Sequence, residues 1–161
     1  MGVEIERKFL VRRERLPSLT GGVPVKQGYI PTENLTTVRI RVKGAEGFLT
    51  VKGPAGIDGT TRPEFEYGIP LADAERMLAS FCGGRTVEKT RYEIPLGGHV
   101  WELDLFSGAN EGLMMAEIEL SDPDEEFVRP DWLDREVTGN LRYCNSRLLE
   151  NPWPTWAEEG D

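Results

Sequence analysis

An alternation of apolar and polar residues with a period of two limits most strongly how this chain can fold. It marks strands whose faces meet different surroundings, because successive side chains of a strand point to opposite sides. The pattern recurs in eight segments: 3–11, 25–30, 37–43, 48–52, 64–69, 87–94, 100–106 and 115–120. Glycine-, proline- and serine-containing turns separate several of them. The sequence therefore predicts a mainly β (α+β) fold, in which an antiparallel sheet curls or closes.

Two short segments show the spacing of a helix. Residues 71–81 place their apolar side chains on one stripe, and residues 141–149 are predicted to form a second helix that stops before Pro152. Both are expected to pack on the sheet. We expect residues 1–150 to form one domain and 151–161 a tail that is frayed toward its end. The core candidates lie on the apolar strand faces: Ile5, Phe9, Val38, Ile40, Leu49, Val51, Phe65, Tyr92, Leu103, Leu105 and Ile118.

The charge of the chain excludes some functions. Its 161 residues include 19 Lys and Arg against 28 Asp and Glu, a net charge of −9, which argues against non-specific DNA binding. The excess of acidic residues is unevenly distributed along the chain. Residues 1–91 hold 15 basic and 11 acidic side chains (net +4), whereas residues 92–161 hold 4 and 17 (net −13). A chain with a basic and an acidic half could still hold a polyanion together with metal cations.

The expected compartment follows from what the sequence lacks. No run approaches the roughly 18 apolar residues of a membrane helix, and the charged first residues do not resemble a signal peptide. Cys82 and Cys144 fit no metal-ligand spacing, so we expect free thiols in a reducing cytoplasm. We expect a monomer or homodimer that binds neither nucleic acid nor membrane.

Charges of like sign are paired on the polar face of almost every predicted strand. Side chains two residues apart lie about 6.5–7 Å from each other, which gives roughly 2.4 kcal/mol of repulsion per pair at an effective dielectric near 20. Water and salt would relieve this on a solvated outer face, although a face selected for solubility would mix the signs. The alternative is a barrel interior. The sets are Glu4, Glu6 and Lys8; Arg39, Arg41 and Lys43; Lys52; Glu64 and Glu66; Lys89, Arg91 and Glu93; Glu102 and Asp104; Glu117 and Glu119.

An interior location favours particular ligands, because ligands of opposite sign would offset the repulsion. Arginine forks and lysine ammonium groups suit a polyphosphate. Carboxylate pairs suit hard divalent cations, Mg²⁺ or Mn²⁺. An eight-stranded barrel has an interior just wide enough for side chains and one small ligand. The pattern therefore favours a small polyanion bound with its metals inside a barrel.

Five charged motifs follow one another on the predicted strands: Glu4-Ile-Glu-Arg-Lys8, Arg39-Ile-Arg41, Lys52, Lys89-Thr-Arg91 and Glu117-Ile-Glu119. In this order they resemble the CYTH, or triphosphate tunnel metalloenzyme, family. The resemblance runs from about residue 2 to 149 and is to the short bacterial branch. It implies a closed eight-stranded antiparallel β-barrel, a tunnel, with a triphosphate inside and a few packing helices outside.

The same resemblance implies roles for individual residues. Glu4 or Glu6 would orient or deprotonate the attacking water, with Lys8 as a further catalytic candidate. Tyr29 falls where the short branch has a tyrosine near this lysine, so both a modulating role and barrel packing stay open. One or two Mg²⁺ or Mn²⁺ ions would be held by Glu4, Glu6, Glu102, Asp104, Glu117 and Glu119. Phosphate oxygens would be bound by Lys8, Arg39, Arg41, Lys52, Lys89 and Arg91.

The expected function is metal-dependent hydrolysis of inorganic tripolyphosphate to pyrophosphate and phosphate, because the short chain has no obvious added nucleoside-recognition segment. Alternatives are thiamine or nucleoside triphosphate hydrolysis, cyclisation of ATP to cyclic AMP, and non-catalytic polyphosphate binding. The complete acidic set counts against binding alone. Other sites are not supported: a Walker A loop is absent, and one histidine, His99, excludes most zinc ligand sets.

Overall fold

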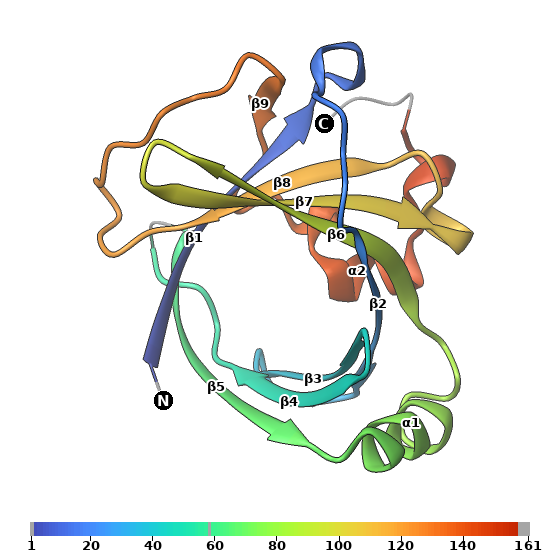
Figure 1. The fold of residues 1–161 in the computed structure, drawn as a ribbon. Coiled ribbons are helices and arrows are strands. Elements are labelled where there is room, and N and C mark those ends of the chain that lie inside the picture. The colour runs from blue at the N-terminus through green and yellow to red at the C-terminus, as the bar shows by residue number, and fades with distance from the viewer. Residues whose placement is uncertain (1, 58, 158–161) are drawn as a thin grey trace.

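The computed structural model describes residues 2–57 and 59–157. In this part of the chain a nine-stranded antiparallel sheet has the order β5-β4-β3-β2-β6-β7-β8-β1-β9. Pairing of β1 with β5 closes eight of the strands into a barrel, which Figure 1 shows end-on. The predicted eight-stranded barrel is confirmed. The strands are β1 (Gly2–Val11), β2 (Val23–Ile30), β3 (Thr37–Lys43), β4 (Glu46–Lys52), β5 (Thr61–Ile69), β6 (Val87–Leu96), β7 (His99–Ser107), β8 (Met114–Glu119) and β9 (Leu133–Glu136).

The helices are short and few in the described residues. Helix α1 (Leu71–Ser80) begins after Pro70 and packs its buried Ala74 and Leu78 on the outside of the barrel. The second predicted helix is interrupted, because Cys144 has an extended backbone. A 3₁₀ turn, η3 (Leu141–Tyr143), precedes that break and α2 (Asn145–Glu150) follows it. The other 3₁₀ turns are η1 (Arg13–Arg15), η2 (Gly108–Asn110) and η4 (Trp153–Thr155).

The ninth strand covers the outside of the barrel and was not predicted. β9 is only four residues long and has no apolar alternation, so it carries no period-two signal. It pairs with the end of β1, and the chain before it packs Trp132 against Trp101 at a centroid distance of 5.7 Å. Phe9 and Ile118 complete this outer core.

At one end of the barrel the inner faces change from charged to apolar. Val87, Phe106 and Met115 each lie two residues from a charged inner-face residue of the same strand. The C-terminal segment packs on them, and Trp156 is only 4% exposed there. The expectation of a frayed end is therefore wrong for the described part of the tail; residues 158–161 lie outside the described residues.

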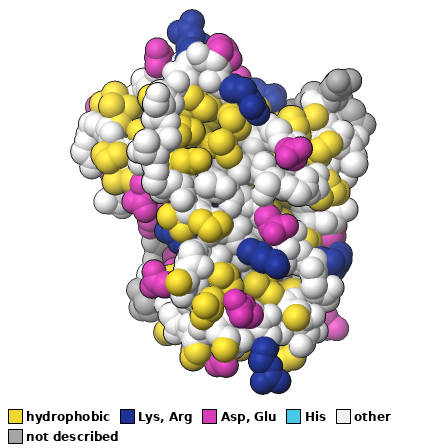
Figure 2. All heavy atoms as spheres, turned by 45° about the vertical axis from the view of Figure 1, so that its right-hand side comes forward, with side chains coloured by type: hydrophobic (Ala, Val, Ile, Leu, Met, Phe, Trp, Pro, Cys, Tyr) yellow, Lys and Arg dark blue, Asp and Glu magenta, His cyan; other side chains and the backbone are white. Residues whose placement is uncertain are grey.

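One face of the outer surface mixes charged and apolar side chains (Figure 2). Figure 2 shows Lys, Arg, Asp and Glu side chains scattered between apolar side chains on one face. Phe65 is 37% exposed, so its prediction as a core residue is wrong: the inner face of β5 belongs to the charged residues on either side of it. The predicted free thiols are confirmed, since Cys82 and Cys144 are unpaired. No helix in the described residues is long and apolar enough to cross a membrane.

Candidate active site

The charged strand faces line a cavity of about 240 Å³ inside the barrel, with all eight barrel strands contributing. Asp104 is the exception among the predicted site residues, because it lies behind the wall of the cavity. The paired charges therefore face the interior rather than bulk solvent. The predicted residues that line the cavity are Glu4, Glu6, Lys8, Tyr29, Arg39, Arg41, Lys52, Lys89, Arg91, Glu102, Glu117 and Glu119.

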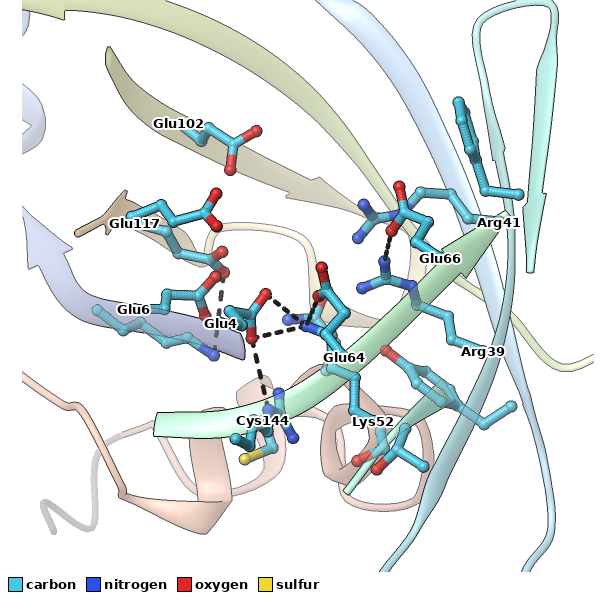
Figure 3. A pocket seen from close by; sticks show the side chains of 18 of the residues that line it. Glu4, Glu6, Arg39, Arg41, Lys52, Glu64, Glu66, Glu102, Glu117 and Cys144 are labelled. Carbon is cyan, nitrogen blue, oxygen red and sulfur yellow. Dashed lines mark hydrogen bonds and ion pairs between the residues drawn. The ribbon is translucent and has the colours of Figure 1, made fainter. Parts of the chain in front are cut away.

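The acidic side of the cavity is formed by β1, β7 and β8. Strand register places Glu6 directly opposite Glu119, and Glu117 directly opposite Glu102. Figure 3 shows Glu6, Glu102 and Glu117 on one side of the cavity and the two arginines of β3 on the other. Like charges that face each other across strands destabilise a sheet unless something neutralises them. Glu102 and Glu117 have ion-pair partners in Arg91 and Lys8. In the described residues Glu6 and Glu119 have none, so their charges are the ones left to be neutralised.

Neighbouring glutamates of β1 differ in how well the protein neutralises them. Burial tends to raise the pKa of Glu4, but Lys52, 2.9 Å from both carboxylate oxygens, brings that pKa below its usual range. No described ion pair involves Glu6. Burial, followed by repulsion from Glu117 and Glu4, raises the pKa of Glu6 to about 8.

The donor chemistry of this wall fits a hard divalent cation. Its carboxylate oxygens are the ligands that Mg²⁺ and Mn²⁺ prefer. In the described residues no three acidic, histidine or cysteine side chains already converge at coordinating distance. Instead Lys52 contacts Glu4, and Lys8 lies 3.9 Å from Glu117. The fit rests on the composition of the wall and on the raised pKa of Glu6, which a bound cation would relieve.

The basic side of the cavity holds a buried guanidinium that has no carboxylate partner among the described residues. The hydrogen bonds of Arg41 in the described residues go to the neutral side-chain amide of Gln27. Burial, followed by repulsion from Arg39 and Arg91, lowers the pKa of Arg41 to about 10. A desolvated cation among other cations is a strong anion site, because low dielectric increases its attraction for an incoming negative charge.

Asp104 is surrounded by cations instead of carboxylates. It is fully buried, with Lys89 Nζ at 2.6 Å and with Arg91 donating to both of its oxygens at 2.8 and 2.9 Å. Burial lowers the pKa of Lys89 to about 7 even though Asp104 opposes that shift. The geometry therefore gives Asp104 the position of an anchor for two cavity-lining cations.

Several cavity residues were missed by the sequence predictions. Arg62 extends the period-two face of β5 beyond the predicted start of that strand, and it lies 3.4 Å from Glu4. Asn145 accepts a hydrogen bond from Lys89 Nζ at 3.0 Å. It belongs to the C-terminal segment, where no local sequence pattern predicts that a residue lines the cavity. The cavity residues without a predicted site role are Thr37, Lys43, Phe48, Arg62, Glu64, Glu66, Cys144, Asn145 and Ser146.

A closed antiparallel barrel with opposed acidic and basic walls around an internal cavity defines a charge-lined tunnel. The CYTH domain matches residues 2–149, and the chain belongs to the CYTH family. It is 46% identical over 158 residues to an inorganic triphosphatase of Acetivibrio thermocellus. The matched residues cover 98% of this chain and 100% of that protein. An inorganic triphosphatase of Nitrosomonas europaea is 41% identical over 150 residues, covering 90% of this chain and 95% of that one. The crystal structure of the inorganic triphosphatase NE1496 superposes with a TM-score of 0.64 at 38% identity, covering 92% of this chain and 95% of that chain.

Proposed function

We propose that this protein hydrolyses inorganic tripolyphosphate to pyrophosphate and phosphate, using Mg²⁺ or Mn²⁺. The observation that carries the proposal is a buried basic wall, incompletely neutralised, facing an acidic wall across one cavity. The two curated relatives, at 46% and 41% identity, are inorganic triphosphatases and support it. Phosphoryl transfer requires mainly positioning and charge stabilisation, which such walls can supply.

The basic residues would bind and align the substrate. Arg39 and Arg41 project from β3, and Lys89 and Arg91 project from β6. Arginine can bind two phosphate oxygens at once, whereas lysine offers a point charge. With Asp104 as their anchor, Lys89 and Arg91 would keep fixed positions before substrate arrives. We therefore propose for Asp104 a positioning role in place of the metal-ligand role expected from the resemblance.

The acidic residues would hold the cation. The remaining predicted ligands are Glu4, Glu6, Glu102, Glu117 and Glu119. A divalent cation held there would neutralise phosphate charge and lower the pKa of a bound water. Glu6 is our candidate for orienting or deprotonating the attacking water, because Lys52 lies against Glu4 whereas no ion pair in the described residues occupies the Glu6 carboxylate.

The lining also favours an inorganic substrate. Among the described residues, the aromatic side chains that line the cavity are those of Tyr29 and Phe48. The rest of the wall is dominated by charged side chains, which suit phosphate oxygens on every side. A nucleoside or thiamine group would have little apolar surface to occupy, and burying it among charges would leave them unpaired.

Phosphate release from tripolyphosphate, ATP and thiamine triphosphate, each with Mg²⁺ and with Mn²⁺, tests this function. We expect tripolyphosphate to be hydrolysed fastest. Glu119→Gln should lower turnover at least about tenfold, and Arg39→Ala should chiefly raise KM by about tenfold or more. Glu75→Gln, on the exposed face of α1, is the matched control and should behave as wild type.

Two results would reject parts of this proposal. Equal or faster turnover of ATP would contradict the assignment of tripolyphosphate as substrate. Tight binding of tripolyphosphate with a divalent cation but without phosphate release would make the protein a binding module.

A further inference from the structure

Gln27 links two cavity residues through a single buried amide. It lies on β2, directly opposite Arg41 of β3 and two residues before Tyr29 on the same strand face. Its side chain is completely buried. Gln27 Oε1 accepts hydrogen bonds from Arg41 Nε at 2.9 Å and Nη2 at 2.7 Å, and Gln27 Nε2 donates to the Tyr29 hydroxyl at 2.6 Å.

The chemistry of the three groups fixes the orientation of the amide. A guanidinium can only donate hydrogen bonds, so the Gln27 oxygen must face Arg41 and the amide nitrogen must face Tyr29. The Tyr29 oxygen is then an acceptor, and its single proton must point away from Gln27. In the described residues this hydroxyl makes no second hydrogen bond, and Tyr29 lines the cavity. The free proton is therefore available to a ligand.

The neutrality of Gln27 matters as much as its geometry. Arg91 is held by the carboxylates of Asp104 and Glu102, which neutralise much of its charge. Arg41 is also held in place, by two hydrogen bonds to one oxygen at 2.9 and 2.7 Å, but its acceptor carries no charge. Its full positive charge therefore stays available to an anion in the cavity.

We propose that Gln27 is a positioning residue that aims the Arg41 guanidinium and the Tyr29 hydroxyl proton at the bound triphosphate. This inference rests on the proposed function and adds to it a residue with no predicted role. Arg41 would bind phosphate oxygens in the ground state. The Tyr29 hydroxyl would donate to an oxygen on which negative charge grows during cleavage, so its hydrogen bond would strengthen in the transition state.

Substitutions of Gln27 with and without the Tyr29 hydroxyl test the proposal. In Gln27→Glu the new carboxylate still accepts from Arg41, but it also accepts the Tyr29 proton and neutralises Arg41. We expect Tyr29→Phe to lower kcat about tenfold, as for one lost transition-state hydrogen bond. Gln27→Glu should lower kcat to the same extent and also raise KM. In the Tyr29→Phe background, Gln27→Glu should still raise KM but leave kcat unchanged.

A second variant and a control guard against a purely structural effect. Gln27→Met removes all three side-chain hydrogen bonds without adding charge, and its effect on kcat should also disappear when Tyr29 is already Phe. Asn110→Leu replaces another buried amide, whose side-chain hydrogen bonds in the described residues go to the backbone of Leu148 and Trp153. It should lower the thermal stability but leave kcat and KM of the folded protein unchanged.

The outcomes separate this inference from the proposed function. A wild-type protein that releases no phosphate from tripolyphosphate refutes the function. If the wild type is active, the inference fails when either Gln27 variant keeps the wild-type kcat, or when it lowers kcat equally with and without the Tyr29 hydroxyl. Non-additivity confined to kcat supports it, because a general loss of structure would multiply with Tyr29→Phe.

Discussion

Individual residues of the cavity take their properties from the neighbours that neutralise them. Glu4 and Glu6 belong to one motif and point the same way from β1. Lys52 lies against Glu4 at 2.9 Å, whereas burial and repulsion from Glu117 and Glu4 dominate at Glu6. Their pKa values therefore shift in opposite directions. Nothing within the motif distinguishes the two positions, because the difference comes from β4 and β8.

The raised pKa of Glu6 predicts a specific pH dependence of stability. The pKa is about 8 in the folded protein against an ordinary value of 4.5, so the folded state retains a proton that the unfolded chain loses. The stability that this proton contributes is complete below pH 4.5 and is lost as the pH rises toward 8. Without divalent cations, the free energy of unfolding of wild type relative to Glu6→Gln should therefore fall by a few kcal/mol between pH 5 and 8.

Urea unfolding in EDTA at several pH values measures this difference. The Glu6→Gln variant carries a neutral side chain of the same shape at every pH, so it serves as the reference for the wild type. Parallel stability profiles for the two proteins would show that Glu6 does not hold a proton at neutral pH.

At the scale of elements, the barrel strands were predictable from period-two alternation, but their ends were not. The predicted strand over 64–69 begins at Thr61 in the structure, which is why Arg62 was missed as a cavity residue. The break in the second helix depends on Cys144, whose backbone conformation has no sequence signal. The face to which a side chain points follows from the local geometry of its strand. Where the strand begins and ends depends on how far the neighbouring strands extend to pair with it.

The C-terminal segment forms part of the barrel's interior packing. Leu148 is completely buried among inner-face residues at the apolar end of the tunnel. Leu148→Ala should therefore lower the free energy of unfolding by about 2–5 kcal/mol. Leu141→Ala, at a position that is 57% exposed, is the matched control and should cost less than about 0.5 kcal/mol. Chemical denaturation measures both; equal, small losses would mean that α2 does not support the barrel.

For the whole molecule, much of the uneven charge along the chain becomes a spatial separation across one cavity, although Glu64 and Glu66 of β5 lie among the cations. The basic first part supplies Arg39, Arg41, Lys89 and Arg91, and the acidic second part supplies Glu102, Glu117 and Glu119. The glutamates of β1 join the acidic wall because β1 pairs with β8. A molecule with net charge −9 can thus attract a polyanion locally, since the nearest charges dominate in a low-dielectric cavity.

Tripolyphosphate should therefore stabilise the folded protein even in EDTA, where turnover stops. At a ligand concentration about 100 times its Kd, the gain is about 2.7 kcal/mol, or a rise in Tm of roughly 5–10 °C. Orthophosphate at the same concentration and ionic strength should give a smaller rise, because it reaches fewer of the cations. Thermal unfolding followed by circular dichroism tests this, and identical shifts for the two anions would contradict a site sized for a triphosphate.

The linear chain already specifies the strands, their alternating faces, the charged residues on those faces and the family to which they belong. These features are encoded locally, in a period of two and in the order of motifs. Folding alone settles that β1 closes on β5, that the charged faces turn inward, and that Gln27 rather than a carboxylate holds Arg41. It also brings the C-terminal segment into the tunnel. These features could not be obtained from the sequence, because electrostatic and packing energies depend on distances in space between residues that lie far apart along the chain.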